Sequence, residues 1–336
     1  MKIAVVGAGS IGGYLGARLA LAGEDVTFIA RGANLQAINA RGFRLIEEDG
    51  TERLARNVRA VQKTADAGPQ DLVLLALKAQ QVGALAAAVP AMFGRDTAVV
   101  TLQNGIPWWY FHKLGGEFDG RPVTSVDPDG AIAAAIPSER IIGSVVYPAS
   151  ELVAPGVVRV IEGNRFSIGE PDNSKSERAQ RISEALTRAG FKSPVSSDLR
   201  SEIWLKLWGN LTFNPVSALT HATLAAICRF PATRALAAEM MAEARTVAEK
   251  LGVRFRIAID KRIAGAEAVG EHKTSMLQDV EHGRALELDA LLGSVIELAR
   301  VTGTPTPHCD AVYACASLLG ATLAAQKGRL QVQAPA

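Results

Sequence analysis

Three polar residues interrupt an apolar run in the second half of the chain, and their types and spacing could support acid–base chemistry. Lys206, Asn210 and Asn214 recur every four residues in a segment framed by Trp204 and Phe213. On an α-helix this spacing forms one polar stripe, with each member turned by roughly 40° from the last. Burying an ammonium and two amides is costly unless each finds a partner, and a bound polar ligand is one such partner. We therefore expect this helix to form one wall of an active site.

The first residues of the chain match a dinucleotide-binding fingerprint. A strand-like apolar run, Met1 to Val6, leads into a GxGxxG motif and then into a helix-compatible stretch. The first glycine makes a tight turn, the second lets a pyrophosphate approach the backbone, and the third permits close helix packing. The amino terminus of the helix then faces the phosphates. The residues predicted to bind a dinucleotide are Gly7, Ala8, Gly9, Ser10, Ile11 and Gly12.

The end of the second predicted strand indicates which nucleotide binds. An NAD enzyme normally places Asp or Glu after this strand, where it accepts a hydrogen bond from the ribose 2′-hydroxyl. This chain places Arg31 after the strand Asp25 to Ala30. A charge-assisted hydrogen bond from arginine to a 2′-phosphate contributes about 1.5–3 kcal/mol. We therefore predict NADP(H), the alternative being a solvated arginine at the end of a strand.

Composition narrows the classes of partner. The 336 residues are enough for two domains, and 36 Lys plus Arg against 34 Asp plus Glu leave a net charge of +2. This balance gives no electrostatic case for binding nucleic acid or an anionic membrane. Cys228, Cys309 and Cys315 lack zinc-site or CxxC spacing, so we predict no metal site and a reduced, cytoplasmic protein.

One apolar stretch has the length of a membrane span. Residues 207–228 contain no Asp, Glu, Lys or Arg. Asn210, Asn214 and His221 interrupt it, and Pro215 is expected to break a helix. We interpret the stretch as a buried pair of helices, and we predict no membrane association.

The hydrophobic period changes near residues 196–200. Before this point the pattern favours a hairpin turning at Asp49-Gly50 and a helix over 174–189, with strands at 71–77, 97–102, 141–146, 157–161, 166–168 and near 191–195. After it only helical periods occur, at 199–214, 217–228, 232–251, about 257–301 and 308–326. The sequence thus predicts an α/β Rossmann-type domain with a parallel sheet over 1–196, an all-α domain over 197–326, and a loose tail over 327–336.

Residues far apart in the sequence are expected to converge on one groove. Lys78 and Asn104 each follow a predicted strand, as Gly7 and Arg31 do. The carboxyl ends of parallel strands line the ligand crevice of an open sheet. Taken alone, Lys78 would be interpreted as a solvated loop residue, and the shared position is what favours a binding role.

A charge-rich segment holds two further candidates, Ser275 and Glu287. Its pattern is equally typical of a helix with one solvated face. On one helix the two residues would be about 18 Å apart. They could contact the same small ligand only if Ser275 precedes the start of the helix.

Taken in order, these motifs resemble those of the ketopantoate reductase (2-dehydropantoate 2-reductase) family, which reduces a branched 2-oxo acid with NADPH. Members combine a Rossmann domain with a helical domain like that of 6-phosphogluconate dehydrogenase, with the site in the cleft between them, and are commonly dimeric. The similarity extends over nearly the whole chain. It comprises GAGSIG, Arg31, Leu77-Lys78-Ala79, Gln103-Asn104-Gly105, Glu202 to Leu207 with Asn210 and Asn214-Pro215, and Ser275 to Asp279 with Glu287.

The resemblance implies a role for each matching residue. Lys206 corresponds to the general acid, which would stabilise and protonate the ketone oxygen as hydride adds to the carbon. Burial would lower the pKa of Lys206, and a neighbouring carboxylate such as Glu287 would oppose that shift. Glu287 and Ala149 correspond to cofactor positions. The substrate-binding positions are Asn104, which also contacts the cofactor, Asn210, Asn214 and Ser275.

Three segments depart from the family pattern and leave the substrate open. One is the strand Val145-Val146-Tyr147-Pro148-Ala149, where the family commonly has Thr-Thr-His-Ala. Residues 116–140 have the character of an insertion, and Trp108-Trp109-Tyr110-Phe111 directly follows the Asn104 loop. If one of these rings lines the pocket, it would favour a bulkier 2-oxo or hydroxy acid than ketopantoate. The alternative is that the rings pack in the core or in a subunit interface. A non-catalytic NADP(H)-binding sensor is a more remote possibility.

Overall fold

The computed structural model describes residues 1–328 and divides into two compact units. The first unit comprises Met1–Val123 and Asp127–Leu199, and the second comprises Thr124–Val126 together with the chain from Arg200 onward. The first is an α/β unit with a mostly parallel sheet and the second is helical, which confirms the predicted fold class. The domain limits 1–196 and 197–326 stay predictions. The expected loose tail, 327–336, lies almost entirely outside the described residues.

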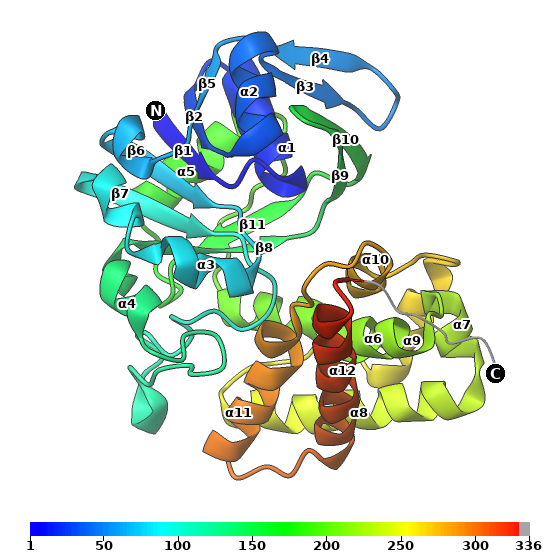
Figure 1. Ribbon diagram of the computed structural model, residues 1–336. Coiled ribbons are helices and arrows are strands. Elements are labelled where there is room, and N and C mark those ends of the chain that lie inside the picture. The colour runs from blue at the N-terminus through cyan, green and yellow to red at the C-terminus, as the bar shows by residue number, and fades with distance from the viewer. Residues whose placement is uncertain (329–336) are drawn as a thin grey trace. The chain divides into compact units, whose positions relative to one another are not determined.

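The first unit alternates strands and helices along most of its length (Figure 1). Its strands are β1 (Lys2–Val6), β2 (Asp25–Ile29), β3 (Phe43–Ile46), β4 (Glu52–Ala55), β5 (Val58–Val61), β6 (Gln70–Leu75), β7 (Phe93–Thr101), β8 (Ile141–Val146), β9 (Ala149–Ala154), β10 (Val157–Glu162) and β11 (Phe166–Gly169). Its α-helices are α1 (Ser10–Leu21), α2 (Gly32–Arg41), α3 (Ala79–Ala86), α4 (Ala131–Ala135) and α5 (Glu177–Arg188), and its short 3₁₀ helices are η1 (Thr64–Ala67), η2 (Val89–Met92), η3 (Gly116–Phe118) and η4 (Ser138–Arg140).

The main sheet has seven strands in the order β11-β8-β7-β6-β1-β2-β5. Every neighbouring pair is parallel except β11 with β8. The carboxyl ends of β1, β2, β6, β7 and β8 therefore share one edge, as predicted. The predicted strand near 191–195 is wrong, because this segment forms only isolated bridges from Lys192 and Val195 to the β11 region.

A second sheet of four strands has the order β4-β3-β10-β9. Strands β3 and β4 pair antiparallel and confirm the hairpin expected around Asp49-Gly50. Strand β9 was not predicted. Its side chains are half-buried or exposed, so no buried apolar run identifies it.

Helix α1 packs closely against strands of both sheets. A Cβ on Gly16 would lie 2.4 Å from the Phe28 ring, and a Cβ on Gly13 would lie 2.3 Å from the Phe43 ring. Phe28 belongs to the seven-stranded sheet and Phe43 to the four-stranded sheet, and their rings stack with centroids 5.0 Å apart. A side chain at either glycine would push α1 away from one sheet. The two glycines thus allow α1 to lie close to both sheets.

The second unit has no strand among its described residues. Its helices are α6 (Leu199–Thr220, whose first residue belongs to the first unit), α7 (Leu224–Arg229), α8 (Pro231–Lys250), α9 (Ile259–Ala268), α10 (Ser275–Glu281), a π-helical turn (Asp289–Gly293), α11 (Ser294–Val301) and α12 (Pro307–Ala325). No helix in residues 1–328 has the length and apolarity that crossing a membrane requires.

Two helix predictions for this unit are wrong. The expected break at Pro215 does not occur, because α6 continues through the proline to Thr220. Leu211, Phe213, Val216 and Ala218 are all buried, so core packing on both sides of the proline keeps the segment helical. The long helix expected over 257–301 is instead divided into α9, α10, the π-helical turn and α11.

The 116–140 segment contributes three residues to the helical unit. The Glu297 carboxylate on α11 accepts hydrogen bonds from the Thr124 amide at 2.7 Å, the Thr124 hydroxyl at 2.8 Å and the Ser125 amide at 2.7 Å. The chain then returns to the first unit, where the Asp127 carboxylate caps α4 by accepting from the Ile132 and Ala133 amides at 2.9 Å each. We call Thr124–Val126 the strap.

Removing the Glu297 charge should destabilise the strap and the helical unit. Burial raises the pKa of Glu297, but the hydrogen bonds from Ser125 and Thr124 outweigh burial and hold the pKa below its usual value. We expect Glu297→Gln to lower the free energy of unfolding at pH 7 by about 1–3 kcal/mol, because a neutral amide cannot accept all three bonds. The exposed Glu239→Gln on α8 is the control and should have no effect.

The difference in stability between the wild type and Glu297→Gln should depend on pH in a defined direction. A carboxylate whose pKa is depressed in the folded state stabilises the protein above its unfolded pKa of about 4.3, and that stabilisation is lost as pH falls through the folded pKa. The difference between wild type and Glu297→Gln should therefore shrink when urea unfolding is repeated below pH 4. A constant difference across this range would contradict the charge-based account of the strap.

Candidate active site

The loop Gly7-Ala8-Gly9, which we call the glycine loop, forms a tight turn between β1 and α1. Gly7 has φ of +101°, and its amide donates to the Ile29 carbonyl at 3.1 Å. A Cβ on Gly12 would lie 2.0 Å from the Gly7 carbonyl oxygen. A side chain is thus excluded at Gly12 by sterics and disfavoured at Gly7 by the backbone angle, as the fingerprint requires.

The surroundings of Gly9 fit a bound pyrophosphate. Gly9 is the N-cap residue of α1, and no side chain caps the helix. A Cβ added at Gly9 would meet no atom within 4 Å, so the space beside its backbone is open. Ser10 and Ile11 begin the helix and are half-buried, whereas Ala8 is buried. Open space at an uncapped helix amino terminus can accommodate a phosphate group.

Asn34 supports this loop and was not predicted. Its side-chain amide donates to the Ala8 carbonyl at 2.5 Å, and its carbonyl accepts from the Gly156 amide at 2.7 Å. It thereby ties the glycine loop to the turn between β9 and β10. The sequence gives no local signal for this role, because Gly156 lies 122 positions further along the chain.

The other predicted cofactor positions follow the carboxyl ends of parallel strands. Arg31 follows β2, is exposed, and is the N-cap residue of α2, while Lys78 follows β6 and is the N-cap residue of α3. Asn104 follows β7 and Ala149 comes shortly after β8, and both are half-buried. Because these strands are parallel neighbours, the structure brings the residues to the same edge of the sheet as Gly7.

Gln103 ties two of these loops together. Its side-chain amide donates to the Leu75 carbonyl at 2.7 Å and to the Leu77 carbonyl at 3.0 Å. The loop that carries Asn104 is thereby held against the loop that carries Lys78. Gln103 was predicted only as part of the motif, and this geometry gives it a supporting role.

The aromatic run lies in the core of the first unit. Trp108, Trp109, Tyr110 and Phe111 are all buried, in a segment of turns rather than a helix. Trp109 donates from its indole to the Thr101 hydroxyl at 3.1 Å, and its ring occupies the space beside Gly143 of β8. Their burial supports the alternative that these rings build the core.

In the second unit, Lys206, Asn210 and Asn214 lie on one face of the continuous helix α6. Burial lowers the pKa of Lys206 to about 8, and the negative charge of Glu287 partly opposes this shift. Asn214 is buried and donates from its amide to the Ser275 hydroxyl at 3.4 Å. Asn210, which lies between Lys206 and Asn214 along α6, is half-buried. The stripe thus combines a cation that titrates near neutral pH with neutral hydrogen-bonding groups.

Ser275 and Glu287 interact with residues at opposite ends of this stripe. Ser275 is the first residue of α10, whereas Glu287 lies beyond the end of that helix and directly before the helical segment that begins at Leu288. The 18 Å separation expected for a single helix therefore does not apply. Ser275 contacts Asn214, and the charge of Glu287 acts on Lys206.

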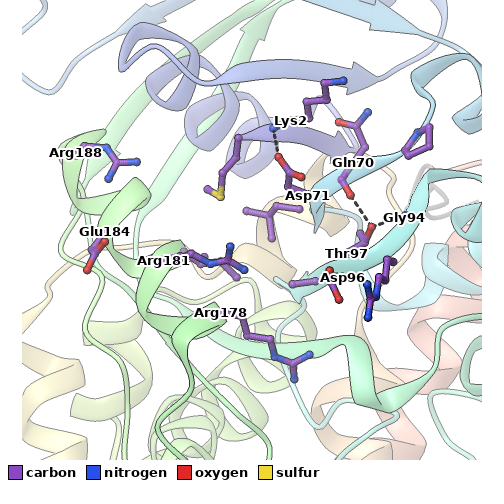
Figure 2. A pocket seen from close by; sticks show the side chains of 16 residues that line it. Lys2, Gln70, Asp71, Gly94, Asp96, Thr97, Arg178, Arg181, Glu184 and Arg188 are labelled. Atoms are coloured by element: carbon purple, nitrogen blue, oxygen red, sulfur yellow. Dashed lines mark hydrogen bonds between the residues drawn. The ribbon is translucent and has the colours of Figure 1, made fainter.

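One cavity of about 740 Å³ lies at the opposite end of the seven-stranded sheet from the glycine loop. It is lined by the amino ends of β1, β6 and β7 and by one face of α5 (Figure 2). Arg178 pairs with Glu170, Arg188 pairs with Glu24, and Asp71 accepts a hydrogen bond from the Lys2 amide. Because acidic residues lie beside the basic ones along its wall, the lining of this cavity favours no class of ligand.

Comparisons with known proteins agree over most of the chain. The family model described as ketopantoate reductase PanE/ApbA matches residues 3–173, and the model for its C-terminal part matches residues 198–319. A 2-dehydropantoate 2-reductase from Mesorhizobium japonicum is 56% identical over 94% of this chain and 96% of its own length.

Solved structures show the same similarity. The crystal structure of a candidate ketopantoate reductase from Ralstonia solanacearum is 41% identical, with a TM-score of 0.91 over 96% of this chain and 98% of that one. A ternary structure of D-mandelate dehydrogenase with NADH and anilino(oxo)acetate is 23% identical, with a TM-score of 0.81 over 96% and 99% of the two chains. At that identity it shares the fold alone.

Two alanine substitutions, one in the glycine loop and one in the first turn of α1, should separate binding from folding. Gly9→Ala adds a methyl group where there is open space and a φ of −79° that alanine accepts, so thermal stability should be unchanged. Its methyl group would occupy the phosphate site and weaken nucleotide binding at least roughly tenfold, about 1.4 kcal/mol. Gly12→Ala forces the Gly7 carbonyl to move and should destabilise the protein by about 1–3 kcal/mol.

Thermal melts and nucleotide titrations of both variants make this comparison. Full nucleotide affinity in Gly9→Ala would show that the phosphates do not approach the backbone at this position.

Proposed function

The chain belongs to the ketopantoate reductase family, and we propose that it reduces 2-dehydropantoate to pantoate with NADPH, using Lys206 as the general acid. The observation that carries this proposal is the Lys206 ammonium, placed on a polar stripe of α6 with a pKa of about 8. A proton donor with this pKa suits catalysis at neutral pH. The sequence similarity over both units supports the choice of substrate.

NADPH supplies the hydride when it is bound. The Gly9 backbone and the amino terminus of α1 would hold its pyrophosphate, and Arg31 would face the 2′-phosphate. Lys78, Asn104, Ala149 and Glu287 are the remaining residues that we assign to the cofactor. Gly7 and Gly12 serve the same site by closing the turn.

Lys206 acts on the oxygen of the substrate carbonyl. As the carbonyl carbon becomes tetrahedral, negative charge grows on the oxygen, and the ammonium stabilises that charge by hydrogen bonding. The Nζ proton then passes to the oxygen, because an alkoxide is far more basic than an amine with a pKa of about 8. Asn210, Asn214, Ser275 and Asn104 orient the substrate through neutral hydrogen bonds to its carboxylate and hydroxyl groups.

The buried aromatic run favours ketopantoate over a bulkier oxo acid. NADPH oxidation with branched, aromatic and hydroxylated 2-oxo acids distinguishes the two, since a higher kcat/KM for an aromatic acid would support the bulkier substrate. Turnover of any oxo acid would exclude a non-catalytic sensor. We further propose that the enzyme is a cytoplasmic homodimer, as the family resemblance implies.

Replacing Lys206 should remove the proton donor. Lys206→Ala is expected to lower kcat by roughly 10²–10⁴ with little change in NADPH affinity. In the wild type the reduction requires the ammonium, so its rate should fall as pH rises through about 8, whereas oxidation of the hydroxy acid should rise over the same range. Steady-state rates in both directions from pH 6 to 10 measure this, and near wild-type turnover in the variant would remove Lys206 from the mechanism.

Replacing Arg31 should affect NADPH alone. Arg31→Ala is expected to weaken NADPH binding by about 1.5–3 kcal/mol and to leave NADH binding nearly unchanged, because only NADPH carries the 2′-phosphate. Arg41→Ala, at the other end of α2 and also exposed, is the matched control. Equal losses for the two nucleotides in Arg31→Ala would indicate a structural role instead.

A further inference from the structure

The helical segment that follows Glu287 begins with an unusual turn. It starts at Leu288, runs as a π-helix over Asp289–Gly293, and continues as α11 from Ser294. A π-helical turn holds an extra residue and is rare in proteins, where it occurs frequently at functional sites. Such a turn persists when contacts from elsewhere in the fold hold it in place.

Tyr313 of α12 provides such contacts. Its hydroxyl donates to Asp289 Oδ1 at 2.6 Å. A Cβ on Gly293 would lie 3.1 Å from Tyr313 Cε2 and 3.3 Å from its hydroxyl oxygen, so the phenol lies directly against the glycine. One side chain thus holds both the first and the last residue of the π-helical turn.

We propose that Tyr313 is a positioning residue, which holds Asp289 and the π-helical turn and thereby fixes the Glu287 carboxylate relative to the Lys206 ammonium. Only one residue, Leu288, separates Asp289 from Glu287 along the chain, so a shift of the turn is expected to move Glu287. Relaxation of a π-helical turn to an α-helical one would rotate the preceding residues by about 100° about the helix axis. The consequence for catalysis rests on the proposed role of Lys206.

The electrostatic effect has a defined direction. Glu287 is the charged group that raises the pKa of Lys206 against the effect of burial. Around Tyr313 the relevant groups are Asp289, Ser317 and Arg300. If Glu287 is released, its mean distance from Lys206 increases, and the pKa of Lys206 must fall below about 8.

Two conservative variants separate the hydrogen bond from the charge. Tyr313→Phe removes the bond and keeps the Asp289 carboxylate, whereas Asp289→Asn keeps an acceptor for the Tyr313 hydroxyl and removes the charge. The pKa of Lys206 is measured directly by the ¹³C shift of its Cε during a pH titration, with the signal assigned from Lys206→Ala. The basic limb of the pH–rate profile is recorded in parallel. Tyr14→Phe, which removes a buried phenol hydroxyl in the first unit, is the matched control.

We expect Tyr313→Phe to lower the pKa of Lys206 by roughly 0.5–1 unit and to move the basic limb of the rate profile by the same amount. Asp289→Asn should shift it by less than half as much, and Tyr14→Phe should not shift it. An unchanged Lys206 titration in Tyr313→Phe would overturn the proposal, and so would an equal shift in Asp289→Asn, because the charge alone would then be responsible. A shifted titration in an enzyme whose Lys206→Ala variant keeps full turnover would leave Tyr313 as a positioning residue and remove the proposed catalytic role of Lys206.

Discussion

The helical unit places one half-buried ammonium group among apolar side chains. Lys206 lies on a helix whose other faces carry Trp204, Leu207 and Trp208 in the core. Bringing a charge into such surroundings is unfavourable, and the neutral amine is therefore closer in free energy to the ammonium than it would be in water. The Glu287 carboxylate moderates this cost without cancelling it. The same desolvation lowers the pKa of Lys206, and the role that we propose for this lysine as a proton donor depends on that shift.

The α/β unit depends on a different constraint, the approach of a helix to two sheets. Glycine at positions 12, 13 and 16 lets α1 approach the neighbouring backbone and aromatic rings more closely than any side chain would permit. This packing fixes the direction of α1 and thereby the place of its amino terminus, where we propose that the pyrophosphate binds. A motif usually described as a binding signature is therefore also a packing signature here.

The features that were predicted from sequence are those with a local period. Buried parallel strands such as β1 and β6 contain continuous apolar runs, and the stripe on α6 repeats every helical turn. Strand β9 was missed because half-exposed polar residues interrupt it, and Pro215 was misjudged because burial on both sides outweighs its local preference. Contacts between distant positions, such as Asn34 with Gly156 or Asn214 with Ser275, depend on the tertiary fold and have no signal in the sequence.

The strap has a consequence for how this chain can be divided. Because Thr124–Val126 belong to the helical unit and their neighbours on both sides belong to the first unit, the polypeptide passes from one unit to the other three times. A fragment beginning at Arg200 would lack the donors that satisfy Glu297, and a fragment ending at Leu199 would contain three residues that belong elsewhere. The two units are thus not separable by a single cut. The helical unit produced alone would need the strap to be supplied, whereas the first unit produced alone would need the strap to be replaced by a linker.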